Sequence, residues 1–187
     1  MSETTAKAIR VITLPPIIAL FLIILLKGYF PDGHDLMAIV LLCGLPLLSY
    51  LYWKTIPGQY EQGRTSQRKL AIIFSVIGYV LGLLYCLICN GSEAELFMYL
   101  NYVICGAVIA LSSFVFHVKS SGHAAGVTAP VMILTLLVSR FYLLGFLLMI
   151  PVSISSISLG RHTPKELLLG SCYGIATTLT LWLCMGR

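Results

Sequence analysis

The stretch AAGVTAPVMILTLLVSRFYLLGFLLMIPVSISSISLG, from Ala124 to Gly160, decides how often the chain can cross a membrane. As one helix it would be roughly 55 Å long at about 1.5 Å per residue, whereas the hydrocarbon core is only about 30 Å thick. The polar sequence SRFY, Ser139 to Tyr142, divides the stretch into two short spans with Arg140 at the turn. Local thinning of the membrane accommodates short spans, so we expect two helices here.

The rest of the chain has the same apolar character. Of its 187 residues, 58% are hydrophobic and 10% are charged, against about 25% charged residues in a soluble domain. This composition is typical of a protein built for lipid, and the length leaves no room for a second sizeable domain, so residues 1–187 are expected to form one domain. We predict an all-α, polytopic transmembrane helical bundle of six to seven spans, near residues 13–30, 36–53, 70–89, 97–116, 126–139, 141–157 and 167–185.

The order of these spans places three polar loops on one membrane face: 54–69, 117–125 and 158–166. The loops 31–35 and 90–95 lie on the opposite face and have the composition of turns, so we interpret His34 as an ordinary loop residue. Most of the twelve lysine and arginine residues fall on the first face, which favours the cytoplasmic side. Several of these cations could instead be there to bind phosphate.

The loop 54–69 carries a basic cluster. Arg64 and Arg68 are four residues apart and would share one face of a helix, and Lys69 is adjacent. Cations at a membrane face suit a phosphate group. The alternative is that these side chains snorkel to the interface and follow the positive-inside pattern.

The loop 117–125 contains Ser121, Gly122 and His123 directly before an apolar helix. Glycine lets the backbone approach an anion, and the N–H groups at a helix start carry partial positive charge. A histidine at this place could donate a proton to a leaving oxygen, and Lys119 adds a charge. The alternative is a helix cap followed by an interfacial histidine.

The loop 158–166 leads into the last predicted helix. Thr163 can cap that helix and Pro164 fits its first turn. His162 and Glu166 are four residues apart, so the carboxylate could accept a hydrogen bond from one imidazole nitrogen and leave the other as a nucleophile. Alternatively, Glu166 is simply an acid placed favourably in a first helical turn.

The order of these motifs resembles the type-2 phosphatidic-acid phosphatase superfamily, a family of metal-independent, integral-membrane lipid phosphatases. The resemblance rests on a basic cluster, then S-G-H, then G-x-H-T-P-x-x-x-x-x-G, and it covers residues 64–170. The two spans between the first and second loops are similar to those of a bacterial subgroup. The resemblance therefore implies an integral protein of a bacterial cell membrane.

The resemblance also implies roles for individual residues. His162 matches the nucleophile, Glu166 the orienting acid, which is usually aspartate, and His123 the proton donor. The implied substrate-binding residues are Ser121 and Gly122 through their backbone, and the cations Arg64, Arg68, Lys69, Lys119 and Arg161. The family's third motif starts with serine-arginine, whereas this chain has Ser155-Ser156, so Arg161 or Lys119 is expected to replace the missing arginine.

These motifs predict a hydrolase that removes phosphate from a lipid phosphate or diphosphate through a phosphohistidine intermediate. The expected partners are membrane lipid and a phospholipid or polyprenyl phosphate substrate: a polyprenyl diphosphate, a phosphatidate or a phosphatidylglycerophosphate. We expect no metal, no cofactor and no nucleic acid. Cys86-x-x-Cys89 has redox or zinc spacing but no second ligand pair, and the sequence has no carboxylate cluster and no nucleic-acid motif. The alternatives are a non-catalytic lipid-phosphate binder or transporter with the same pocket and, less favoured, phosphoryl transfer between lipids.

Overall fold

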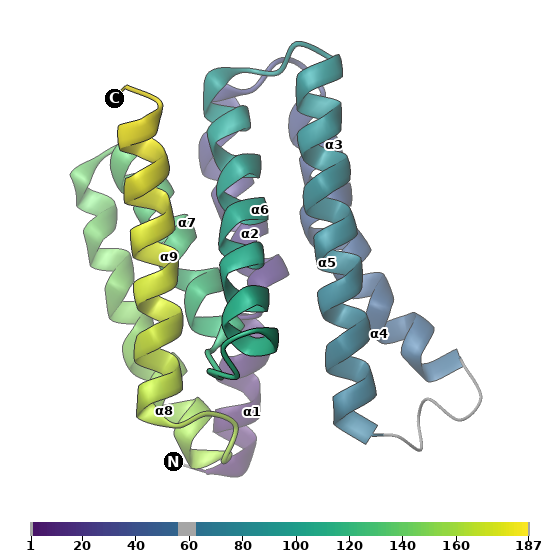
Figure 1. The fold of residues 1–187 in the computed structure, drawn as a ribbon, viewed down its shortest axis with the longest axis vertical. Helices are drawn as coiled ribbons and strands as arrows, with labels where there is room; N and C mark the ends of the chain where they lie inside the picture. Colours follow the sequence, from purple (N-terminus) through teal and green to yellow (C-terminus); the bar gives the residue numbers. More distant parts are fainter. Residues whose placement is uncertain (1, 56–62, 187) are drawn as a thin grey trace. The chain divides into compact units, whose positions relative to one another are not determined.

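The computed structural model describes residues 2–55 and 63–186, apart from the side chains of residues 64, 65, 68 and 114. Within these ranges the chain is helical and has no β-strand (Figure 1). The prediction of an all-α fold is therefore confirmed. The chain divides into two compact units, one made of Met1–Ile18 and Leu100–Arg187, the other of Ala19–Tyr99. Two helices, α2 (Pro15–Leu26) and α6 (Glu93–Phe114), run from one unit into the other along the chain.

The unit Ala19–Tyr99 contains a long helical path that begins at His34. It runs through α3 (His34–Ile39), the π-helical segment η2 (Val40–Gly44) and α4 (Leu45–Thr55), which together form one candidate span of 22 residues. Both η2 and α4 pack against α5 (Gly63–Ile88). A short 3-10 helix, η1 (Lys27–Tyr29), follows α2.

The interpretation of His34 as an ordinary loop residue is wrong. His34 is the first residue of α3 and is buried, and its Nδ1 lies 2.8 Å from Oε2 of the fully buried Glu95. The ring of Tyr85 lies against the imidazole, with 4.8 Å between the ring centroids. The partner of His34 is more than sixty residues away in the sequence, so the composition of the loop gave no sign of it.

The unit made of the two chain ends holds the second and third polar loops. After α1 (Glu3–Ile12) and α6 it continues with α7 (Gly122–Leu137), the 3-10 helix η3 (Arg140–Leu148), α8 (Met149–Ser158) and α9 (Pro164–Cys184). The α7 helix packs against α9, η3 and α8, and α1 packs against α8 (Figure 1). Most residues of α7 are buried, so α7 is the core helix of this unit.

Within residues 2–55 and 63–186, five helical segments are long and apolar enough to cross a membrane, and the bent pair of α1 with Pro15–Tyr29 would make a sixth span. Helix α7 ends at Leu137 and η3 begins at Arg140, so the predicted division at Ser139–Tyr142 is confirmed. With 16 residues, α7 would be about 24 Å long, shorter than the hydrocarbon core. The predicted span 126–139 is thus a short helix, and its burial explains why it need not meet lipid along its length.

Two glycines on α9 allow α7 and α9 to approach closely. Gly170 and Gly174 form a G-x-x-x-G pattern, and a Cβ atom at Gly170 would overlap the backbone of Ser121. A Cβ atom at Gly174 would overlap the side chain of Thr128. The Thr128 hydroxyl also lies 3.3 Å from the carbonyl oxygen of Ser171 across the same contact. Small residues of this kind let the backbones of membrane helices come together.

We predict that Gly170→Ala lowers thermal stability in detergent. The added methyl group meets backbone atoms, which cannot rotate away, and overpacking of this kind typically costs about 1–3 kcal/mol. Gly28→Ala is the matched control, because nothing lies within 4 Å of a Cβ atom built at Gly28. Equal melting temperatures for the two variants would show that the α7–α9 contact tolerates a side chain.

Candidate active site

The second and third polar loops meet at the starts of α7 and α9. The Ser121 N–H donates to the carbonyl oxygen of Glu166 over 2.9 Å. Each helix start is capped by a hydroxyl: the Ser121 Oγ accepts from the Ala124 N–H and the Thr163 Oγ1 accepts from the Glu166 N–H, both over 3.2 Å. The predicted cap at Thr163 is confirmed, with Pro164 in the first turn. Two helix N-termini, each with partial positive charge, therefore lie side by side.

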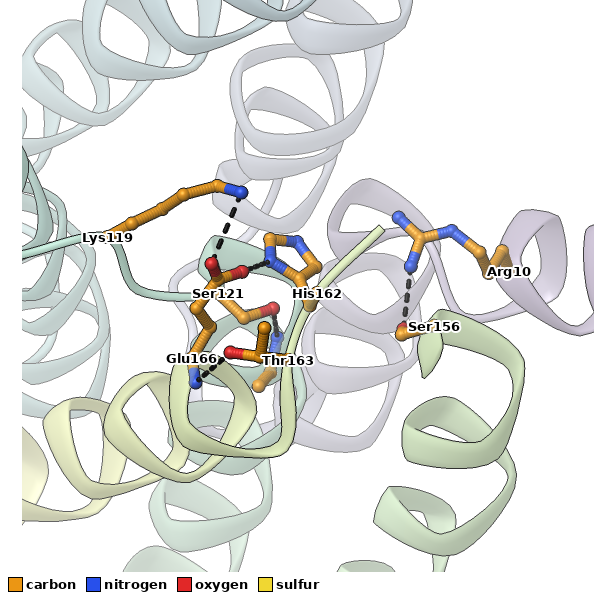
Figure 2. Close-up of polar contacts among 8 residues, drawn as sticks. Arg10, Lys119, Ser121, Ser156, His162, Thr163 and Glu166 are labelled. Atoms are coloured by element: carbon orange, nitrogen blue, oxygen red, sulfur yellow. Dashed lines mark hydrogen bonds and ion pairs between the residues drawn. The ribbon is translucent and has the colours of Figure 1, made fainter. Parts of the chain in front are cut away.

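His162 is held by the carboxylate four residues later. Its Nδ1 lies 2.7 Å from Oε2 of Glu166, and the other carboxylate oxygen, Oε1, lies 3.2 Å from the ammonium group of Lys119 (Figure 2). A carboxylate only accepts hydrogen bonds, so Nδ1 carries a proton, and in the neutral ring Nε2 is then the nitrogen that can act as a nucleophile. Figure 2 shows Nε2 on the side of the ring that points away from the carboxylate.

His123 has a different environment. It is 8% exposed, and its Nε2 lies 3.0 Å from the hydroxyl of Thr13. That hydroxyl donates its single proton to the carbonyl of Ile9 over 2.8 Å, so it accepts from His123, which is protonated at Nε2. Burial, followed by the charges of Arg10 and His162, lowers the pKa of His123 to about 3. At neutral pH and without substrate, His123 is therefore an uncharged imidazole.

The N-terminal helix supplies two residues that no sequence motif indicated. Arg10 donates from Nη1 to the hydroxyl of Ser156 over 2.7 Å, and Thr13 contacts His123. Ser156 and its neighbour Ser155 are fully buried. Arg10 and Thr13 are three residues apart and thus lie on the same side of α1. That spacing was the available signal, but nothing in the sequence indicated which loop α1 would meet.

The other residues predicted by sequence fall into two groups. Arg161 lies in the loop 158–166, as predicted. Its backbone N–H donates to the carbonyl of Ser156 over 2.9 Å, and its buried Nε has no hydrogen-bond partner among the described residues. Lys69 is exposed in the other unit, and the side chains of Arg64 and Arg68 lie outside the described residues. The structure therefore brings together six predicted residues: Lys119, Ser121, Gly122, His123, His162 and Glu166.

The backbone N–H groups of Ser121 and Gly122, both expected to bind phosphate, differ in the structure. The Ser121 N–H already donates to Glu166. The N–H groups of Gly122 and His123 come in the first turn of α7, before an intrahelical acceptor is available. An anion at this helix start would meet those two donors, and the open space around Gly122 leaves room for it.

Among the described residues, no group of three or more His, Cys, Asp or Glu side chains is placed to hold a metal ion. In the comparisons with known proteins, no family model, no curated protein and no solved structure matches this chain.

We predict that the low pKa of His123 makes the protein less stable in acid. The unfolded chain binds a proton at this histidine below pH 6.5, whereas the folded chain does not until near pH 3. The contribution of His123 to the free energy of unfolding is therefore fully present above pH 6.5. Below that pH it falls by up to about 1.4 kcal/mol per pH unit. Thermal unfolding in detergent between pH 6.5 and 5 should show a shallower slope for His123→Gln than for the wild type. Identical slopes would mean that His123 is protonated in the fold.

Proposed function

We propose that this protein is a membrane-bound phosphatase that releases phosphate from a lipid phosphate or diphosphate. The observation that carries the proposal is the Nδ1–H of His162 held by the Glu166 carboxylate, with Lys119 on the second oxygen. This arrangement fixes one tautomer and orients a nucleophilic nitrogen, as the third member of a catalytic triad does. The presence of His123 within electrostatic range of His162 gives the second histidine that the reaction needs.

In the first step, Nε2 of His162 attacks phosphorus and the bond between phosphorus and the lipid oxygen breaks. His123 donates a proton to that oxygen, which leaves as an alcohol or, from a diphosphate, as a lipid monophosphate. His123 is neutral in the empty site, so the proton must arrive with the substrate or from water. The negative charge of a bound phosphate raises the pKa of a neighbouring imidazole and favours this uptake.

In the second step, the now neutral His123 takes a proton from water as the water oxygen attacks phosphorus. The bond from phosphorus to Nε2 of His162 breaks, and inorganic phosphate leaves. His162 returns to the neutral tautomer with its proton on Nδ1, which the hydrogen bond to the Glu166 carboxylate favours. Cations and the N–H groups at the start of α7 stabilise the charge on the transferring phosphoryl group.

The surroundings of the site support a lipid substrate. The site lies at the start of α9, which is long and apolar enough to cross a membrane. Large apolar side chains on the same unit face outward, among them Leu168 and Leu179 of α9. A lipid tail would extend along such a surface while the head group reaches the two histidines. Polyprenyl diphosphates, phosphatidates and phosphatidylglycerophosphate-like lipids all meet this requirement.

A second function, a non-catalytic lipid-phosphate binder or transporter, is favoured by one observation. The charge of Lys119 faces the carboxylate of Glu166 at 3.2 Å, so part of the positive charge that could stabilise a transition state is already compensated. A binder would retain phosphate affinity and release no phosphate. Phosphate release from purified protein over a panel of lipid substrates distinguishes the two functions.

We predict that His162→Ala abolishes phosphate release, because no neighbouring residue can supply the same nucleophile. Glu166→Gln should keep the fold and lose much of the rate, since it removes the charge that stabilises an oriented imidazole. The wild-type rate should persist in a metal chelator. Lipid-substrate turnover in detergent, with folding checked by thermal shift, measures all three.

His117→Asn is the matched control for the nucleophile. His117 lies in the loop 117–125 and is exposed, and its φ of 53° is one that asparagine adopts readily. Its rate should stay near that of the wild type. Full activity in His162→Ala would end the phosphohistidine mechanism, whatever the behaviour of the control.

We predict that Arg64→Ala and Arg68→Ala each weaken turnover, whereas Lys165→Ala matters less. A charge-assisted contact to phosphate is typically worth about 1.5–3 kcal/mol, roughly 10- to 150-fold in rate. Steady-state kinetics on the best lipid substrate measure this effect. Wild-type kinetics in both arginine variants would remove the loop 54–69 from the site.

A further inference from the structure

We infer that Arg10 of α1 binds the phosphoryl group of the substrate and that Thr13 positions His123, so that the N-terminal helix completes the site. This inference rests on the proposed function and assigns it a phosphate-binding residue outside the three polar loops. Arg10 also places a guanidinium beside Ser156, the position of the family's missing arginine, for which the resemblance implied Arg161 or Lys119 as a replacement.

The position of Arg10 is fixed by a buried partner. Its Nη1 donates over 2.7 Å to the hydroxyl of Ser156, which has no exposed surface. Figure 2 shows the guanidinium extending from α1 to the end of α8, in a view that also includes His162 and Lys119. A planar guanidinium binds two oxygens of a phosphate at once, which a lysine ammonium group does not. A fixed guanidinium also loses less conformational freedom when the anion binds.

The charge of Arg10 acts on the proposed reaction centre. After burial, the charge of Arg10 is the largest cause of the lowered pKa of His123, ahead of His162. The guanidinium therefore lies within interaction range of that imidazole. A cation beside a neutral histidine repels the proton that the histidine must acquire before it can act as an acid. Binding of a phosphate would offset that repulsion and bring the two groups into one cluster around the anion.

Thr13 connects the same helix to the second histidine. Its hydroxyl bonds to His123 at 3.0 Å and to the Ile9 carbonyl at 2.8 Å, which fixes the tautomer of the imidazole. Helix α1 therefore contacts α8 through Arg10 and α7 through Thr13. The two contacts place α1 beside the end of α8 and the start of α7. Thr13 does not need to touch the substrate in order to affect the reaction, because it acts through His123.

The contrasting interpretation is that Arg10 only fastens α1 to α8. If Arg10 only fastens α1, Arg10→Ala should lower thermal stability and leave phosphate affinity unchanged. If Arg10 binds phosphate, Arg10→Ala should weaken phosphate affinity whether or not stability changes. Lys7→Ala is the matched control, because Lys7 is on the same helix, carries the same charge and is exposed, paired only over one helical turn with Glu3.

The experiment measures two quantities for the wild type and for Arg10→Ala, Arg10→Lys and Lys7→Ala in detergent. One is the protection of the fold by inorganic phosphate in thermal unfolding, and the other is kcat/KM for lipid phosphate. We expect Arg10→Ala to weaken phosphate affinity and kcat/KM by about 10- to 100-fold. Arg10→Lys should fall between it and the wild type, and Lys7→Ala should match the wild type.

A further variant separates the contact between Arg10 and Ser156 from the binding of phosphate by the guanidinium. The variant Ser156→Ala removes the hydroxyl that Arg10 contacts and keeps the guanidinium, so it should lower stability while its phosphate affinity stays closer to that of the wild type than that of Arg10→Ala. For the positioning residue, Thr13→Val should shift the pH profile of kcat and leave phosphate affinity near that of the wild type.

The outcomes separate the inference from the proposed function. If the wild type releases phosphate while Arg10→Ala and Lys7→Ala behave alike, the role of Arg10 is wrong and the phosphatase stands. If the wild type is protected by phosphate but hydrolyses no lipid, the phosphatase is wrong, and the affinity of Arg10→Ala still decides the role of Arg10. A wild type with neither protection nor phosphate release overturns both.

Discussion

The hydrogen bond from the Ser121 amide to the Glu166 carbonyl, 2.9 Å long, is the contact on which the arrangement of the site depends. It joins the start of α7, which carries His123, to the start of α9, which directly follows the loop that carries His162. The bond forms only because Gly170 has no Cβ atom where the backbone of Ser121 passes. Gly174 repeats this close approach one turn later, so the seam between the helices is held at two levels. The placement of the two histidines thus follows from the packing of small residues.

The two histidines differ because their neighbours carry opposite charge. His162 donates to a carboxylate, whereas His123 is buried near Arg10 and donates to a neutral hydroxyl. Burial disfavours an unpaired charge, so the second histidine remains neutral while the carboxylate of Glu166 is satisfied by His162 and Lys119. Environments that push two titratable groups apart in this way are typical of sites with separate nucleophilic and acid–base roles. The proposed phosphatase mechanism uses this difference.

Helix α1 shows how a short polar segment can matter in an apolar protein. Its contacts reach Ser156 and His123, which lie 146 and 110 residues further along the chain. Its exposed face carries the charged residues Glu3 and Lys7, which pair with each other. His34, the first residue of α3, shows the same dependence, because its buried partner Glu95 lies 61 residues further along the chain. In both cases the partner of a polar side chain comes from a segment far away in the sequence.

The sequence by itself determined the helical class, the division at Ser139–Tyr142, the cap at Thr163 and the spacing that allows His162 to pair with Glu166. These features are local: apolar run length sets a span, and a spacing of four residues on a helix brings two side chains together. Only the tertiary structure decided that Arg10 and Thr13 lie at the site, that His34 pairs with Glu95, and that α7 is a short core helix. Those contacts join segments far apart in the chain, and no local pattern encodes which helix packs against which. The G-x-x-x-G pattern at Gly170 and Gly174 was visible in the sequence, but its partner on α7 was set by packing alone.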